Sequence, residues 1–122
     1  MKVLIADDDH MFTHLITAQL HARGWHVEVA HDAMQAVMYA MRVEPDVIVL
    51  DIGMPGGNGF GVLEKLNKSV RTESIPIVVV TNSITPGDEA KALSLGAVAF
   101  LHKPVDIERL NEILTRVLAL IA

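Results

Sequence analysis

Five short runs of apolar residues alternate along the chain with longer segments in which apolar residues recur every three or four positions. The runs are Val3–Ala6, Val27–Ala30, Val47–Leu50, Ile77–Val80 and Ala97–Leu101. Most of them are continuous rather than alternating, and they are rich in β-branched residues, as expected for strands of a sheet that is covered on both faces. The pattern therefore predicts five buried strands.

The segments between these runs have the spacing of amphipathic helices. Their apolar stripes are Phe12, Leu15, Ile16 and Leu20; Ala33, Ala36, Val37, Ala40 and Met41; Val62, Leu63 and Leu66; and Ile107, Leu110, Ile113, Leu114, Val117 and Ile121. Capping residues support these helices: Asp9 and Asp32 precede two of them, and Thr85 followed by Pro86 predicts a cap and a first helical residue. The six methionines are interpreted as core filler.

Strict alternation of strands and helices predicts an α/β fold, a parallel sheet with helices on both faces and right-handed crossovers. Five strands are typical of the flavodoxin-like three-layer (βα)5 arrangement with strand order 2-1-3-4-5, although periodicity alone does not determine the order. The chain has 122 residues and no linker or internal repeat. We expect one domain, residues 1–122, with no effector domain in this chain.

Composition excludes several classes of function. There is no cysteine, so disulfides, thiolate metal sites and cysteine nucleophiles are ruled out. The formal net charge of −5 and the lack of a basic stripe argue against a nucleic-acid partner. No apolar run approaches the ~18 residues that span a bilayer, and no secretory signal is present. We expect a cytoplasmic protein without membrane insertion.

Polar side chains gather where four of the five predicted strands end. The first is followed by Asp7, Asp8 and Asp9, the third by Asp51, the fourth by Thr81 and Asn82, and the fifth by His102, Lys103 and Pro104. The second strand ends at Ala30 and His31 and contributes least. Because ligands of open parallel sheets bind beyond the carboxyl ends of the strands, these side chains are expected to line one pocket.

The residue types in this pocket indicate phosphoryl transfer. Neighbouring carboxylates repel one another unless a cation neutralises them, and oxygen-only ligands favour a hard ion such as Mg²⁺. Lys103 and Thr81 offer donors to an anionic oxygen on the other side of the pocket. A metal ion opposed by donors suits phosphoryl transfer, with a carboxylate as the nucleophile.

Four motifs carry a resemblance to a known family: "VLIADDD", "VIVLDIGMPGGNG", "VVVTN" and "FLHKP". Over essentially its whole length the chain resembles the receiver domain of two-component response regulators, and it is similar to the single-domain chemotaxis type. The resemblance implies that Asp51 accepts the phosphoryl group and that Asp8 and Asp51 bind Mg²⁺ directly. It also implies that Asp7 binds Mg²⁺ mostly through a water and that the Gly53 carbonyl is a backbone ligand of the ion. Lys103 would contact a phosphoryl oxygen, and its peptide bond to Pro104 would be cis. Thr81 and Phe100 would be the residues that change position on phosphorylation.

The resemblance also implies the biological role. A histidine kinase or a histidine phosphotransfer protein would dock near Phe12 and Leu15 and phosphorylate Asp51. Phosphorylation would change a surface that binds an unknown downstream protein. A phosphorylation-dependent dimer is a further possibility. The protein would be a signalling module of a phosphorelay and not a metabolic enzyme. Two alternatives remain: a receiver-like binding scaffold that is never phosphorylated, and a phosphohydrolase acting through an aspartyl phosphate. The latter is disfavoured because Gly53 stands where such enzymes usually carry a second aspartate.

Three residues near the acceptor depart from the common family pattern or bear on phosphoryl lifetime. Asn82 stands where a small residue is usual, so we hypothesise that it narrows access to Asp51. Gly53 and Ser83 provide little bulk on the other flanks, which acts in the opposite direction. The net lifetime is therefore left open.

Three histidines share one face of the first predicted helix. His10, His14 and His21 fall within about 40° of one another at ~100° per residue. That face lies opposite the apolar stripe, so it is interpreted as a solvated face in preference to a zinc site.

Overall fold

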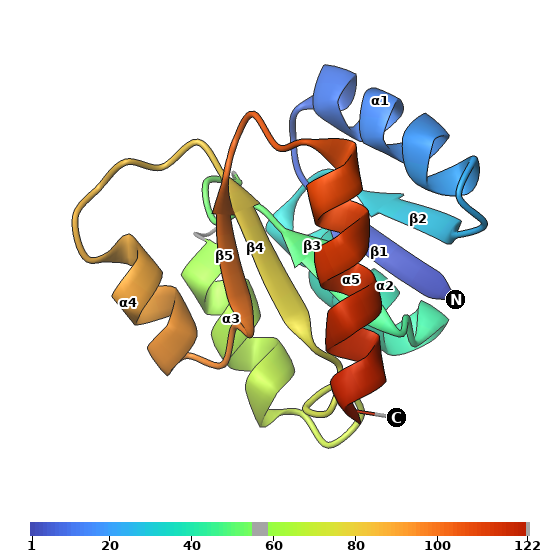
Figure 1. The fold of residues 1–122 in the computed structure, drawn as a ribbon. Helices are drawn as coiled ribbons and strands as arrows, with labels where there is room; N and C mark the ends of the chain where they lie inside the picture. Colours follow the sequence, from blue (N-terminus) through green and yellow to red (C-terminus); the bar gives the residue numbers. More distant parts are fainter. Residues whose placement is uncertain (55–58, 122) are drawn as a thin grey trace.

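The fold is a five-stranded parallel sheet flanked by five helices, as the alternation predicted (Figure 1). The computed structural model describes residues 1–54 and 59–121. The strands are β1 Lys2–Ala6, β2 His26–Ala30, β3 Val47–Leu50, β4 Ile77–Thr81 and β5 Ala99–His102. The helices are α1 His10–His21, α2 Ala33–Val43, α3 Gly59–Lys68, α4 Asp88–Ser94 and α5 Ile107–Ile121. The strand order is β2-β1-β3-β4-β5, which confirms the flavodoxin-like order.

Alternate residues of the central strands divide the core into two layers. Val3 and Ile5 of β1 pack in a cluster with Leu20 of α1 and Leu114 of α5. Their neighbours in the strand point to the opposite face, where Leu4 packs in a cluster with residues of α2, α3 and α4. Both faces are apolar because both are covered by helices, which explains why the strands read as continuous apolar runs.

Local sequence signals set the boundaries of α1 and α2. The Asp9 carboxylate accepts a hydrogen bond from the backbone N–H of Phe12 at 3.0 Å, and Asp32 does the same for Gln35 at 2.8 Å. Gly24 has φ +92° in the turn after α1, a conformation that side chains with a Cβ rarely adopt. These contacts confirm the two predicted N-caps.

The predicted start of α4 is wrong. The helix begins at Asp88, and its N-cap is Gly87 in the left-handed conformation at φ +88°, not Thr85. Pro86 and Gly87 form a turn that is closed by the backbone N–H of Asp88 donating to the carbonyl of Thr85 at 3.2 Å. The Pro-Gly pair thus makes a turn before the helix instead of its first residues.

Two further core predictions are corrected. Leu15 is 55% exposed, and the buried face of α1 is formed by Thr13, Ile16 and Leu20. Thr13 can be buried because its hydroxyl donates to the carbonyl of His10 at 3.1 Å. Most methionines are not core filler: four of them are exposed, and Met54 is buried in the core. The exposed ones are Met1, Met11, Met34 and Met38.

Among the described residues, no helix combines the length and the apolar character that crossing a bilayer would require.

Candidate functional site

The backbone of the site extends the parallel ladder by one residue at three strand ends. The N–H of Asp7 donates to the carbonyl of Ala30 at 2.9 Å, and the N–H of Asp51 donates to Ala6 at the same distance. At the far side, Lys103 N–H donates to the carbonyl of Thr81 at 2.9 Å. The side chains that follow the strands are therefore held in register with one another.

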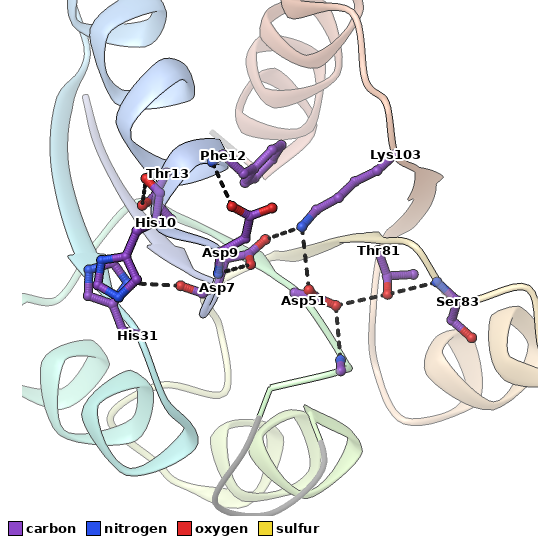
Figure 2. Close-up of polar contacts among 11 residues, drawn as sticks. Asp7, Asp9, His10, Phe12, Thr13, His31, Asp51, Thr81, Ser83 and Lys103 are labelled. Carbon is purple, nitrogen blue, oxygen red and sulfur yellow. Dashed lines mark hydrogen bonds and ion pairs between the residues drawn. The ribbon is translucent and has the colours of Figure 1, made fainter.

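Asp51 is buried and hydrogen-bonded through one carboxylate oxygen. Its Oδ1 accepts from the Thr81 hydroxyl at 2.8 Å and from the Gly53 N–H at 2.9 Å. Its Oδ2 faces the Lys103 ammonium at 3.5 Å. Figure 2 shows Asp51 between Thr81 on one side and Lys103 on the other. One oxygen is thus fixed by two neutral donors, while the other faces a cation.

Lys103 reaches across the pocket and pairs most closely with Asp7. The distance from its Nζ to Asp7 Oδ2 is 2.7 Å, shorter than the distance to Asp51 (Figure 2). The ammonium also lies over the ring of Phe12, 4.2 Å from the ring centroid. The Lys103 side chain is only 7% exposed. As the resemblance implied, the bond from Lys103 to Pro104 is cis.

Burial and the neighbouring charges shift the pKa of each residue of this pair, Asp7 and Lys103, in opposite directions. Burial raises the pKa of the Asp7 carboxyl, and the Lys103 ammonium and the N–H of Asp9 offset only part of that rise. Burial also acts to lower the pKa of Lys103, but the Asp7 hydrogen bond and the charges of Asp7 and Asp51 outweigh it, so this pKa is raised. Lys103 is therefore firmly cationic, while Asp7 is ionised at a cost.

Three carboxylates form a compact oxygen cluster. Asp7, Asp8 and Asp51 each offer an oxygen within 4.8 Å of the others, and they are the only group of this kind among the described residues. Asp8 is exposed while the other two are buried, so the cluster opens to solvent on one side. An all-oxygen set with an open side fits Mg²⁺, which uses one or two carboxylates and keeps several waters.

A hydrogen-bonded chain runs from the pocket to α4. The N–H of Ser83 donates to the Thr81 hydroxyl oxygen at 3.2 Å, and the Ser83 hydroxyl donates to the Asp88 carboxylate. Phe100 is partly buried against the core and meets the His102 ring edge-on at 5.4 Å between centroids. Thr81 thus contacts both Asp51 and the segment that leads into α4.

Of the predicted residues, Asp7, Asp8, Asp51, Thr81 and Lys103 are brought together. Gly53 joins them through its N–H, and Asn82 is exposed beside them. Sequence reasoning did not assign Phe12 to Lys103 or His31 to the Asp7 backbone. The Nδ1 of His31 lies 3.0 Å from the Asp7 carbonyl oxygen. The Phe12 contact has no local sequence signal, because it depends on how α1 lies beside the ends of the strands. The His31 contact depends on the side-chain rotamer of a residue that follows β2, the neighbour of β1.

Comparison with known proteins now identifies the family. The family model of the response regulator receiver domain matches residues 3–115. The chain is a response regulator receiver domain. Proteins of this family are signalling modules of two-component systems.

This receiver domain resembles both short and long relatives. It is 36% identical to Protein PilH of Pseudomonas aeruginosa over 118 residues, which covers 97% of this chain and 98% of PilH. It is 39% identical to response regulator PleD of Caulobacter vibrioides over 105 residues, which covers 86% of this chain and 23% of PleD. The receiver domain therefore spans nearly all of one relative and less than a quarter of the other.

Solved structures agree with the fold of this receiver domain. The chemotaxis response regulator CheY4 of Vibrio cholerae matches with a TM-score of 0.87 and 30% identity, over 95% of this chain and 97% of that one. The receiver domain of the sensor histidine kinase PA1611 from Pseudomonas aeruginosa matches with a TM-score of 0.89 and 27% identity, over 97% of both chains. That structure has a magnesium ion coordinated in its active-site cleft.

Proposed function

We propose that this receiver domain accepts a phosphoryl group on Asp51 from a phosphohistidine donor and thereby switches a protein-binding surface. The observation that carries the proposal is the arrangement around Asp51. A buried carboxylate has one oxygen held by Thr81 and Gly53, and its other oxygen faces Lys103 at 3.5 Å, beside two further aspartates.

In the proposed reaction, an oxygen of Asp51 attacks the phosphorus atom of the donor. The new Asp51 O–P bond forms as the P–N bond to the donor imidazole breaks, and the imidazole leaves with the electron pair and takes up a proton. Such transfers depend mainly on positioning and on neutralising charge. The ladder bonds that hold Asp51 and Lys103 supply the positioning.

Lys103 and Thr81 are the residues of this chain that would meet the arriving charge. The Lys103 ammonium is paired with Asp7 and also faces Asp51 Oδ2, so it already lies beside the carboxylate that would attack the phosphorus atom. Thr81 donates to Asp51 Oδ1, and the same hydroxyl would donate to a phosphoryl oxygen after transfer. Ser83 is hydrogen-bonded to both Thr81 and Asp88, the first residue of α4. A movement of the Thr81 side chain would therefore be transmitted to α4.

Asp7, Asp8 and Asp51 would hold Mg²⁺, with the Gly53 carbonyl as a further proposed ligand. When bound, the ion would neutralise the clustered carboxylates and the incoming phosphoryl oxygens. The raised pKa of Asp7 supports this assignment, because a carboxylate that is buried at a cost is relieved by a cation.

The donor would dock on α1, next to the open side of the pocket. Met11 and Leu15 are one turn apart on this helix and are 75% and 55% exposed. Exposed apolar residues beside a reactive site indicate a surface that another protein covers. The output surface is proposed at α4, β5 and α5, where Phe100 and the exposed Leu93 and Val98 lie.

The test is mass spectrometry of the intact protein after incubation with acetyl phosphate and Mg²⁺. We expect a gain of one phosphoryl group, placed on Asp51 by peptide mapping, and no gain in Asp51→Asn or after chelation of the metal. Phosphate on another residue would contradict the proposal, and no gain with either acetyl phosphate or a phosphohistidine donor would favour an unphosphorylated scaffold.

A further inference from the structure

Beside the acidic cluster, a second group of ligating side chains lines a separate cavity of about 290 Å³. Its lining residues are His10, Thr13, His14, Thr17, Val29 and His31. The rings of His10 and His31 are stacked, with centroids 3.9 Å apart and planes inclined by 18° (Figure 2). The sequence had grouped His10 and His14 with His21. In the fold, the third histidine of the cavity is not His21 but His31, which directly follows the C-terminal end of β2.

The hydrogen bond of His31 determines which of its nitrogens is free. A carbonyl oxygen can only accept, so the 3.0 Å contact with the Asp7 carbonyl places the proton on Nδ1 of the neutral ring. The lone pair then lies on Nε2. Donation of the other ring N–H to a backbone carbonyl is the usual arrangement of a histidine that binds a metal, because it fixes the tautomer and the ring orientation.

His10 and His14 supply a pair of imidazoles at the spacing i, i+4. Two histidines at this spacing lie on one face of a helix and can bind the same metal ion. Both side chains are exposed, and among the described residues the side chain of His14 has no hydrogen bond, ion pair or ring contact. All three side chains line the same cavity, but their nitrogens do not converge on one point, since the aspartates form the only such ligand group among the described residues. A metal lies in the plane of each imidazole that binds it, so binding would require the exposed rings of His10 and His14 to rotate, His10 out of its stack, while His31 stays bonded to the Asp7 carbonyl.

The lining of the cavity determines the kind of ion that it would take. It contains imidazoles and threonine hydroxyls but no carboxylate, which disfavours Mg²⁺ and favours a borderline ion such as Zn²⁺. Thr17 also lines the cavity, and its Oγ1 is buried without a hydrogen-bond partner among the described residues.

We propose that His10, His14 and His31 form a Zn²⁺-binding site that is distinct from the aspartate cluster. The site joins the first turns of α1 to the segment that follows β2. Because His31 is bonded to the backbone of Asp7, the ion would brace the flank of the phosphoacceptor pocket. The proposal does not depend on phosphorylation of Asp51.

The test is titration of tag-free full-length protein with ZnCl₂ in excess Mg²⁺, followed by calorimetry and by NMR of the six histidine side chains. We expect one Zn²⁺ per chain and shifted imidazole signals for His10, His14 and His31. The signals of His21, His26 and His102 should stay in place. Stoichiometric binding that moves those three signals instead, or no binding, would overturn the proposal.

Variants locate the site independently. His14→Ala and His31→Ala should each weaken Zn²⁺ binding at least tenfold, since even loss of an outer partner costs about 10–100-fold. His21→Ala is the matched control, because it is also exposed and lies on the same helix. It should bind like the wild type, and so should Asp51→Asn. An equal loss in His21→Ala, or a loss in Asp51→Asn that matches His31→Ala, would assign the ion elsewhere.

Discussion

At the residue scale, the ammonium of Lys103 is where the contacts of the pocket meet. It touches Asp7, faces Asp51 and lies over the ring of Phe12. An aromatic face attracts a desolvated cation and, unlike a third carboxylate, adds no charge to the pocket. Phe12 therefore positions the lysine without competing for it.

Replacing Phe12 tests this role. In Phe12→Leu the apolar volume is largely kept but the π face is lost, so we expect phosphorylation by acetyl phosphate to slow by up to roughly 30-fold, in line with about 2 kcal/mol for a desolvated cation–π contact. Phe12→Tyr keeps the ring face and should be close to the wild type. The measurement is the initial rate of phosphoprotein formation by mass spectrometry. Equal rates for the leucine and tyrosine variants would contradict a role for the ring.

Variants of Gly53 and Asn82 test whether access of water controls the lifetime of the phosphoryl group on Asp51. A Cβ at this position would lie 3.4 Å from Asp51 Oδ1, which is an ordinary contact. Gly53→Met should therefore fold, shield the acyl phosphate from water and lengthen its lifetime, measured as the loss of phosphate after the donor is removed. Asn82→Ala removes bulk from another flank and should shorten the lifetime. Unchanged lifetimes in both variants would show that access does not limit hydrolysis.

The side chains of the pocket differ in how far they could be predicted. Asp7, Asp51, Thr81 and Lys103 follow strands directly, and a parallel sheet brings such positions to one edge. Their grouping was therefore readable from the chain. Phe12 lies in a helix, and its contact with Lys103 depends on the packing of α1. His31 follows a strand like the others, but its contact with the Asp7 carbonyl depends on a side-chain rotamer that the pattern of the chain does not specify.

At the element scale, α1 shows why apolar spacing alone misjudges a face. Leu15 was predicted to be in the core, but Thr13 takes the buried position because its hydroxyl bonds within its own helix. In the same way, α4 starts later than predicted because Gly87 can adopt a left-handed turn that the Thr-Pro signal does not anticipate. Strands were easier to predict, since burial on both faces leaves an unbroken apolar run.

The exposed face of α1 leads to a prediction about partner choice. Leu15→Asp should lower the rate of transfer from a phosphohistidine donor at least tenfold, because it places a charge in an apolar contact. Phosphorylation by acetyl phosphate should not change, since Leu15 is outside the pocket. Met38→Asp is the matched control, because Met38 is 47% exposed on α2. Equal effects of the two variants on donor transfer would argue against docking on α1.

At the scale of the whole molecule, the pocket lowers the stability of the fold. The pKa of Asp7 is raised from 3.8 in the folded chain, mainly by burial. The folded protein therefore keeps this proton over a pH range above 3.8 in which the unfolded chain has released it. Stability falls as the pH rises through that range, and it stays lower above it.

The substitution Asp7→Asn should remove this loss of stability. In metal-free buffer at neutral pH we expect the free energy of unfolding to rise, because the variant removes one of three clustered carboxylates while Lys103 keeps Asp51 as a partner. The gain should disappear at low pH and shrink when Mg²⁺ is added, since the ion stabilises only the wild-type cluster. Urea unfolding at several pH values measures it, and a less stable variant at neutral pH would contradict the argument.

The ladder bonds at the strand ends have a consequence for how such proteins diversify. Asp7, Asp51 and Lys103 are tied to neighbouring strands through their own backbone, whereas Leu15, Leu93 and Val98 stand on outer surfaces away from these bonds. Substitutions on the outside can therefore exchange one partner for another while the reactive carboxylate stays where it is. Signalling pathways built on this fold can be insulated from one another by surface drift alone, without re-evolving the chemistry.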